Sequence, residues 1–105
     1  MRDIKEAEKI KLEDIIRVLR EHKEELAERY NVKEIGVFGS YVRGEQKEGS
    51  DIDILVEFYE VPSLLRFVNL ENYLSDLLEM KVDLVMKKAL KRSIGEEILR
   101  EVVTI

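Results

Sequence analysis

The 105-residue chain is long enough for one small domain with a single core, which we expect to span residues 1–105. Hydrophobic residues make up 45% of it, too many for a disordered chain, and 23 acidic against 18 basic side chains give a formal charge of −5. Ten of the acidic but only three of the basic residues fall within 45–85. This stretch would repel a phosphate backbone, so stable nucleic-acid binding is not expected.

The chain contains no cysteine, which excludes disulfides and thiolate metal sites and fits a reducing compartment. Its first residues, MRDIKEAEKIK, are charged throughout and lack the apolar centre of a signal peptide. No apolar run approaches the roughly 20 residues of a membrane span. We therefore expect a cytoplasmic protein without membrane association.

The first expected element is a helix over residues 3–30. His22, the only histidine, is expected on its solvent side, where a lone histidine is seldom a ligand or a catalyst. The apolar side of this helix covers either the sheet or a second subunit. Apolar residues recur along it at helical spacing, namely Ile10, Leu12, Ile15, Ile16, Leu19, Leu26 and Tyr30.

A strand, a short helix and a second strand are expected next. KEIGVFG, residues 33–39, is rich in strand-forming residues and ends in glycine. SYVRGE then favours one or two helical turns, and QKEGS a polar loop. DIDILVEF, residues 51–58, predicts the second strand.

The remainder of the chain continues the alternation of helix and strand. Pro62 and Ser63 begin a helix, VDLVM at 82–86 predicts a third strand, residues 94–102 a further helix, and VVTI an edge strand or a contact segment. This order favours one α/β domain in which helices pack on a sheet. The buried stripe of the helix after Ser63 is expected to contain Leu64, Phe67, Leu70, Leu74, Leu77 and Leu78. At the end of the chain we expect Ile98 in the core, and contact roles for Val102, Val103 and Ile105.

Two aspartates in the second strand suggest a cation site. Side chains at i and i+2 of a strand point to the same face, so Asp51 and Asp53 project together. Neighbouring carboxylates repel and raise each other's pKa, and a divalent cation removes that penalty. Mg²⁺ suits such a site because it prefers oxygen ligands and takes one or two protein carboxylates together with substrate phosphates.

Asp83 extends this pattern into the third strand. Apolar neighbours place it in an expected interior strand, where an unpaired charge is costly. If the second and third strands are neighbours, Asp83 completes a cluster of three carboxylates, the usual platform for two-metal chemistry at phosphorus. The alternative is that the aspartates only mark a solvent-facing edge.

The Gly39–Ser40 turn joins the first strand to the short helix. A glycine there lets the backbone approach a ligand closely, and the helix start offers free N–H groups to an anion. Ser40 can cap the helix and donate its hydroxyl to a phosphate, and Arg43 lies one turn later. The plainer alternative is an ordinary cap with a surface arginine.

These residues in this order resemble a known signature. Gly39-Ser40, a ten-residue spacer, Asp51-x-Asp53 and a downstream Asp83 resemble the DNA polymerase β-type nucleotidyltransferases. The small size is similar to their minimal (MNT) branch, known from HEPN/MNT toxin–antitoxin pairs. The resemblance spans nearly the whole chain and implies a small mixed β-sheet packed by helices. Val42 stands where this family more usually has alanine.

The resemblance also implies a mechanism and a partner. A nucleoside triphosphate, ATP in the first instance, would bind on Gly39 and Ser40, with Arg43 reaching the same phosphates. Asp51 and Asp53 would hold two Mg²⁺ ions, and Asp83 would bind the catalytic metal and serve or position the base. The acceptor would be a tyrosine hydroxyl of a HEPN-type toxin, so that the protein acts as its antitoxin within a homo- or hetero-oligomer. Two alternatives are transfer to a small-molecule hydroxyl, and an antitoxin that neutralises its partner by binding alone.

Overall fold

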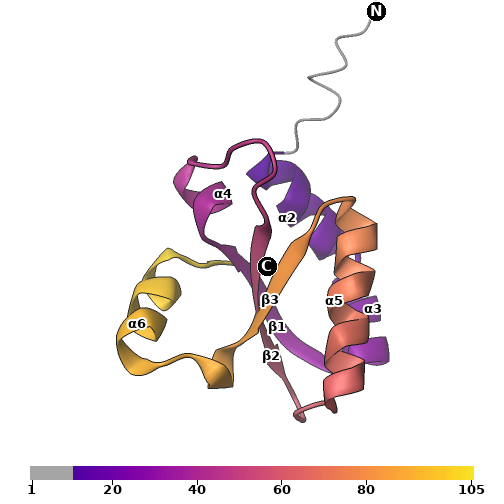
Figure 1. Ribbon diagram of the computed structural model, residues 1–105. Helices are drawn as coiled ribbons and strands as arrows, with labels where there is room; N and C mark the ends of the chain where they lie inside the picture. The colour runs from indigo at the N-terminus through magenta and orange to yellow at the C-terminus, as the bar shows by residue number, and fades with distance from the viewer. Residues whose placement is uncertain (1–10) are drawn as a thin grey trace, which may run out of the picture.

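The computed structural model describes residues 11–105, in which helices and strands alternate as the sequence predicts (Figure 1). The part of the expected first helix that precedes residue 11 lies outside the described residues. The elements in chain order are α2 (Leu12–Glu21), α3 (Lys23–Tyr30), β1 (Val32–Phe38), α4 (Ser40–Arg43), β2 (Ile52–Phe58), α5 (Leu64–Leu78), β3 (Val82–Met86), the 3-10 turn η1 (Lys87–Ala89), α6 (Arg92–Glu101) and β4 (Val103–Thr104).

The four strands form one mixed sheet in the order β3-β2-β1-β4. β1 pairs antiparallel with β2 and with β4, whereas β2 and β3 run parallel. The mixed sheet and the pairing of β2 with β3 confirm the expectation, and β4 is the predicted edge strand. The interior position predicted for β3 is wrong, because β3 forms the other edge of the sheet.

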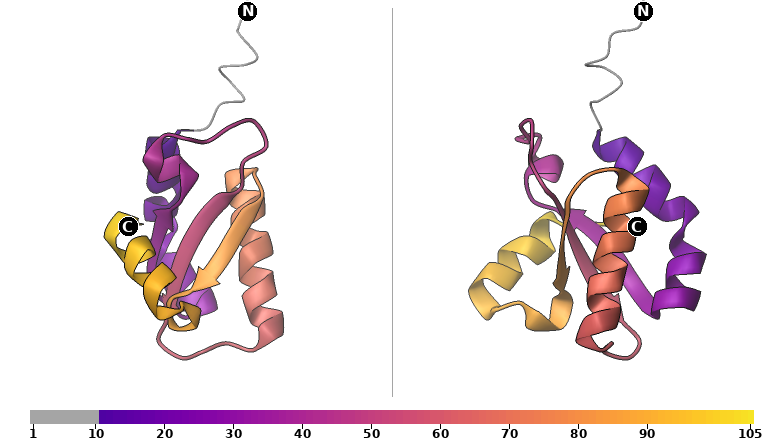
Figure 2. Two further views of the ribbon diagram at one scale, coloured as in Figure 1. Left: turned by 60° about the vertical axis from the view of Figure 1, so that its left-hand side comes forward. Right: turned by 45° about the vertical axis from the view of Figure 1, so that its right-hand side comes forward.

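The two faces of the sheet have different neighbours. α2, α3 and α5 cover one face, while α6 lies on the other side (Figures 1 and 2). Even-numbered residues of β2 and β3 are buried under the three helices, as Ile52, Ile54 and Leu84 show. The alternation of a strand therefore leaves odd-numbered residues, Asp53 and Asp83 among them, on the side of α6.

The predicted helix over 3–30 is interrupted within the described region. The chain leaves the helical conformation at His22, which ends α2 and precedes α3. His22 is half-buried rather than turned to solvent, and its Nδ1 lies 2.8 Å from the carbonyl oxygen of Val18. The same carbonyl accepts the His22 backbone amide at 3.2 Å, so the last turn of α2 closes on His22.

α5 begins where Pro62 and Ser63 predict, with the Ser63 hydroxyl accepting a hydrogen bond from the Arg66 amide at 3.3 Å. Leu70, Leu74 and Leu78 form its buried stripe. Leu64 was expected in this stripe but is 78% exposed. No helix within residues 11–105 is long and apolar enough to cross a membrane.

A polar cluster joins α3 to α5 on the surface. The Tyr73 hydroxyl donates to Glu25, which also pairs with Arg29 at 3.0 Å. The Arg29 guanidinium lies 5.2 Å from the centre of the Tyr73 ring, a cation–π distance. Partial burial and the hydrogen bond to Glu25 raise the pKa of Tyr73 to about 12, and the bonds from Tyr73 and Arg29 lower the pKa of Glu25.

The Tyr73→Phe variant is expected to lose stability less steeply than the unmodified protein at alkaline pH, where Tyr41, whose pKa is also raised, still contributes. Because the pKa of Tyr73 is raised in the folded state, its contribution is complete below the ordinary value of 10.0 and is lost as the pH rises through about 12. Urea unfolding of both proteins from pH 8 to 12 measures this. An equally steep decline in the variant would show that Tyr73 is not its source.

Candidate active site

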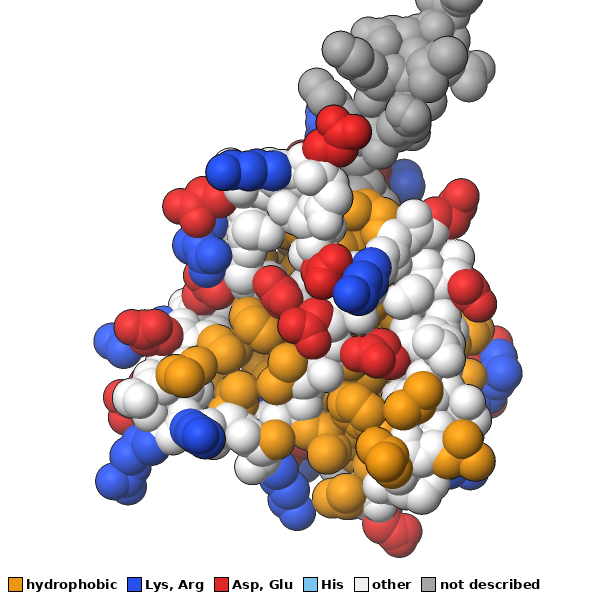
Figure 3. Space-filling view, viewed as in Figure 1, with side chains coloured by type: hydrophobic (Ala, Val, Ile, Leu, Met, Phe, Trp, Pro, Cys, Tyr) orange, Lys and Arg blue, Asp and Glu red, His pale blue; other side chains and the backbone are white. Residues whose placement is uncertain are grey.

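A cleft of about 480 Å³ lies between the sheet and α6. Its apolar wall includes Phe38, Val85 and Ile98. Ile98, expected in the core, thus lines the cleft instead. Figure 3 shows acidic side chains gathered in the middle of this face, next to the apolar side chains of the hollow beside α6. The polar lining includes Gly39, Arg43, Asp53, Asp83, Glu97 and Glu101.

Asp53 and Asp83 lie directly opposite each other on the parallel strands β2 and β3. Asp53 is half-buried and Asp83 is exposed, since β3 is an edge strand. Burial, then the negative charges of Asp83 and Asp51, raise the pKa of Asp53 above its ordinary 3.8. The predicted repulsion between the three carboxylates is therefore present at Asp53.

Asp51 stands one residue before β2 and is not part of the cleft lining. Its Oδ2 lies 4.0 Å from Nζ of Lys81, and both side chains are exposed, so this pair contributes little to stability. Asp51 nevertheless lies close enough to Asp53 for its negative charge to raise the pKa of Asp53.

The carboxylates fit a divalent cation that is completed by a substrate. Within residues 11–105, no group of three or more His, Asp or Glu side chains is gathered closely enough to hold a metal ion alone. Mg²⁺, however, takes oxygen ligands and usually only one or two protein carboxylates, with phosphate oxygens completing its shell. Asp53 and Asp83 provide such oxygens, and a cation there would relieve the repulsion that raises the pKa of Asp53.

Gly39 shapes the floor of the cleft. Its backbone has φ 83° and ψ −152°, a conformation that is essentially restricted to glycine. A Cβ atom at this position would lie 2.1 Å from Oδ2 of Asp53, so only a residue without a side chain leaves the carboxylate in place. Gly39 is also the N-cap of α4. Ser40 is the first residue of that helix and does not cap it, which corrects the expectation for this hydroxyl.

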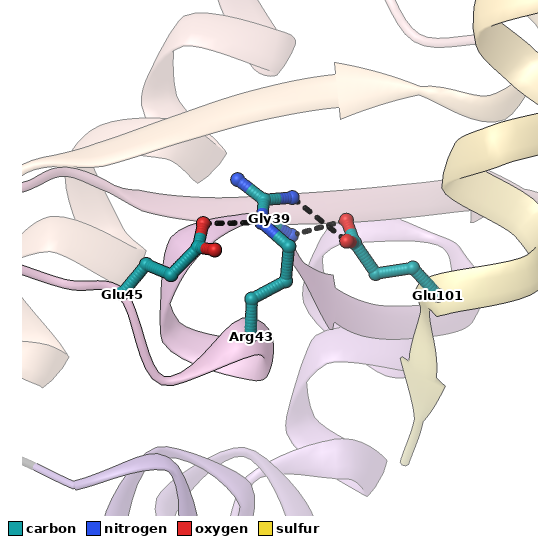
Figure 4. A network of polar contacts seen from close by, with 4 residues as sticks. All are labelled: Gly39, Arg43, Glu45 and Glu101. Atoms are coloured by element: carbon teal, nitrogen blue, oxygen red, sulfur yellow. Dashed lines mark hydrogen bonds and ion pairs between the residues drawn. The ribbon is translucent and has the colours of Figure 1, made fainter.

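Glu101 was not predicted as a site residue, yet it accepts hydrogen bonds from the Gly39 amide and from Arg43, two of the three groups predicted to bind phosphate (Figure 4). Its Oε2 accepts a hydrogen bond of 2.8 Å from the Gly39 amide, and its Oε1 one of 2.7 Å from Nη1 of Arg43. Arg43 also donates through Nε to Glu45 at 2.8 Å. Burial raises the pKa of Glu101, but the bonds from Arg43 and Gly39 outweigh it and hold that pKa below 4.5.

The sequence carries no local signal for Glu101. It lies 62 residues after Gly39 and follows no motif, and only the pairing of β4 with β1 brings the end of α6 to the turn. Of the predicted residues, the structure brings Gly39, Arg43, Asp53 and Asp83 into one cleft, whereas Ser40 and Asp51 are not part of its lining.

Comparison with known proteins gives the family. Residues 19–104 match the family model described as a nucleotidyltransferase domain. The chain is 63% identical over 92 residues to the protein adenylyltransferase MntA of Thermococcus cleftensis, which covers 88% of this chain and 93% of that protein.

Solved structures agree with the sequence matches. A structure described as a minimal nucleotidyltransferase superposes with a TM-score of 0.77 at 37% identity, over 93% of this chain and 99% of that one. A toxin–antitoxin crystal structure with AMP-PNP is similar with a TM-score of 0.64 at 27% identity, over 86% of this chain and 68% of that one.

Proposed function

Since the chain belongs to the nucleotidyltransferase family, in its minimal branch, and is an enzyme of that class, we propose that it transfers AMP from ATP to a hydroxyl group of a partner protein. The observation that carries this proposal is the cleft in which Asp53 and Asp83 face each other beside the Gly39 turn. Opposed carboxylates next to an anion-binding turn are the arrangement that phosphoryl chemistry needs.

In the proposed mechanism the turn holds the triphosphate. The Gly39 amide, the Ser40 hydroxyl and the Arg43 guanidinium bind the β- and γ-phosphates, which leaves the α-phosphorus near Asp53 and Asp83. Asp51, Asp53 and Asp83 would hold two Mg²⁺ ions, whose chemistry is to neutralise charge on the phosphates. Asp83, which is more exposed than Asp53 opposite it, orients the acceptor hydroxyl or accepts its proton. The acceptor oxygen bonds to the α-phosphorus while the bond to pyrophosphate breaks, in line.

We further propose that the acceptor is a tyrosine of a HEPN-type toxin, which this protein would silence as its antitoxin. Two similarities support a protein acceptor: the relative named as a protein adenylyltransferase and the toxin–antitoxin structure with AMP-PNP. The exposed surface supports it as well. Large apolar side chains gather over the first turns of α5 on the face that carries the cleft (Figure 3), and isolated soluble proteins seldom expose such patches. The exposed apolar residues of these turns are Leu64, Leu65 and Val68.

Transfer to a small-molecule hydroxyl is the second candidate. The cleft between the sheet and α6 favours it, because a volume of about 480 Å³ would admit a small acceptor. Neutralisation by binding alone is the third, and the intact set of three aspartates speaks against it.

The test uses ATP radiolabelled at the α-phosphorus, Mg²⁺, and the protein with the partner that co-purifies from its source. Label is expected on the partner polypeptide, and no label is expected with Asp51→Asn, Asp53→Asn. Label on a small molecule would replace the protein acceptor by the second candidate. Tight partner binding without any label would overturn the enzymatic proposal in favour of the third.

A further inference from the structure

One carboxylate of the chain fills the place that the turn offers to an anion. The two oxygens of Glu101 accept from two different donors, the Gly39 amide and the Arg43 guanidinium, in the way that two oxygens of a phosphate would (Figure 4). Hydrogen bonds to charged groups contribute more than neutral ones, and Glu101 is only 21% exposed. A phosphate that binds these donors has to displace this side chain.

The backbone around Glu101 fixes the side chain in that place. Glu101 is the last residue of α6, and β4 follows after Val102 and pairs with β1 opposite Gly36 and Val37. Val102 and Val103 pack so closely on Gly36 that a Cβ there would lie 2.7 Å from the Val102 side chain. The hydrogen bond from the Ile105 amide to the Ile35 carbonyl, at 2.9 Å, ties down the residues that follow.

We infer that Glu101 is a built-in competitor for the nucleotide phosphates, and that ATP binds only when this carboxylate leaves Gly39 and Arg43. The inference rests on the proposed function to the extent that the Gly39 turn receives the triphosphate. It adds that the last residue of α6 sets the affinity for the nucleotide. Once Glu101 is displaced, Nη1 of Arg43 can bind a phosphate oxygen in place of the Glu101 carboxylate, while Nε of Arg43 still donates to Glu45.

The test is the affinity for ATP, and separately for inorganic tripolyphosphate, measured calorimetrically with Mg²⁺ and no acceptor. Glu101→Gln removes the charge and cannot accept at both positions, so we expect both ligands to bind about tenfold more tightly. Equal gains for both ligands would place the effect at the phosphates. Because no acceptor is present, the result is independent of whether label reaches a partner protein.

Glu97→Gln is the matched control. Glu97 lies one turn earlier on α6 and lines the same cleft, but among residues 11–105 the Gly39 amide and Nη1 of Arg43 hydrogen-bond to Glu101 and not to Glu97. Glu97→Gln removes the same charge from the same helix, and we expect it to change the affinity for either ligand less than about twofold. If Glu101→Gln does not fold, Glu101→Asp replaces it, because the shorter carboxylate cannot reach both donors. Unchanged or weaker ATP binding in the Glu101 variant, or an equal gain in the control, would overturn the inference.

Discussion

Replacing Gly39 by alanine is expected to abolish nucleotidyl transfer and to lower the free energy of unfolding by about 2–3 kcal/mol. The backbone at Gly39 has a positive φ of 83°, which alanine adopts only under strain. The added Cβ would also lie 2.1 Å from Oδ2 of Asp53, so the carboxylate has to move out of its place. Transfer of label to the acceptor and urea unfolding measure the two effects.

Gly49→Ala separates the strain from the collision. Gly49 has nearly the same φ, 85°, but nothing lies within 4 Å of its missing Cβ. We expect this variant to lose about 1 kcal/mol of stability and to keep its transfer rate within about twofold. If both glycine variants lose activity alike, the collision with Asp53 is not the reason that position 39 requires glycine.

Asp53→Asn is expected to lower the rate of transfer at least about 100-fold and to make the protein more stable. The amide is a poor cation ligand, so the chemistry is lost. The gain in stability has another origin, because burial and two neighbouring carboxylates disfavour the charge of Asp53 in the folded state. With EDTA present at pH 7, we expect the melting temperature to rise by roughly 2–4 °C, about 0.5 kcal/mol.

The pH dependence identifies the source of that gain. The pKa of Asp53 is raised in the folded protein, so the penalty exists only where Asp53 is ionised. The advantage of Asp53→Asn should therefore be complete near neutral pH and vanish as the pH falls through the raised pKa to below 3.8. Asp76→Asn, an exposed change on α5, serves as the control and should show neither the loss of activity nor this pH dependence. A gain that persists at low pH would exclude charge repulsion as its cause.

Period and spacing predicted much of the molecule. The residue pattern predicted strands over 33–39 and 51–58, and the structure has them at Val32–Phe38 and Ile52–Phe58. The i, i+2 rule correctly placed Asp53 on the face away from the core. The position of a strand and the side to which its residues point depend on residues that are adjacent in the sequence. The register of β2 against β3, which sets Asp53 opposite Asp83, was expected only on condition that the two strands pair.

The predictions that were wrong concern positions that tertiary contacts decide. Asp83 reads as interior because its neighbours are apolar, yet the strand order leaves β3 at an edge, where a carboxylate remains hydrated. Leu64 follows the helical period of α5, but no neighbouring element buries it and its side chain is 78% exposed. The apolar period predicts one continuous helix, but α2 ends at His22, whose half-buried ring contacts the Val18 carbonyl. Glu101 reaches the turn only through the pairing of β4, which no local pattern specifies.

The alternation of core-facing and cleft-facing side chains along β2 and β3 also determines which substitutions each position tolerates. Packing under the helices constrains Ile52, Ile54 and Leu84, because they belong to the core. The chemistry of the cleft constrains Asp53 and Asp83, which are adjacent to them in the sequence. A saturation library read once for soluble yield and once for transfer should therefore split these strands into two interleaved sets. Substitutions at the cleft-facing positions can then change the reactivity without disturbing the core-facing positions. The fold should therefore tolerate a change of substrate far better than a change of its core.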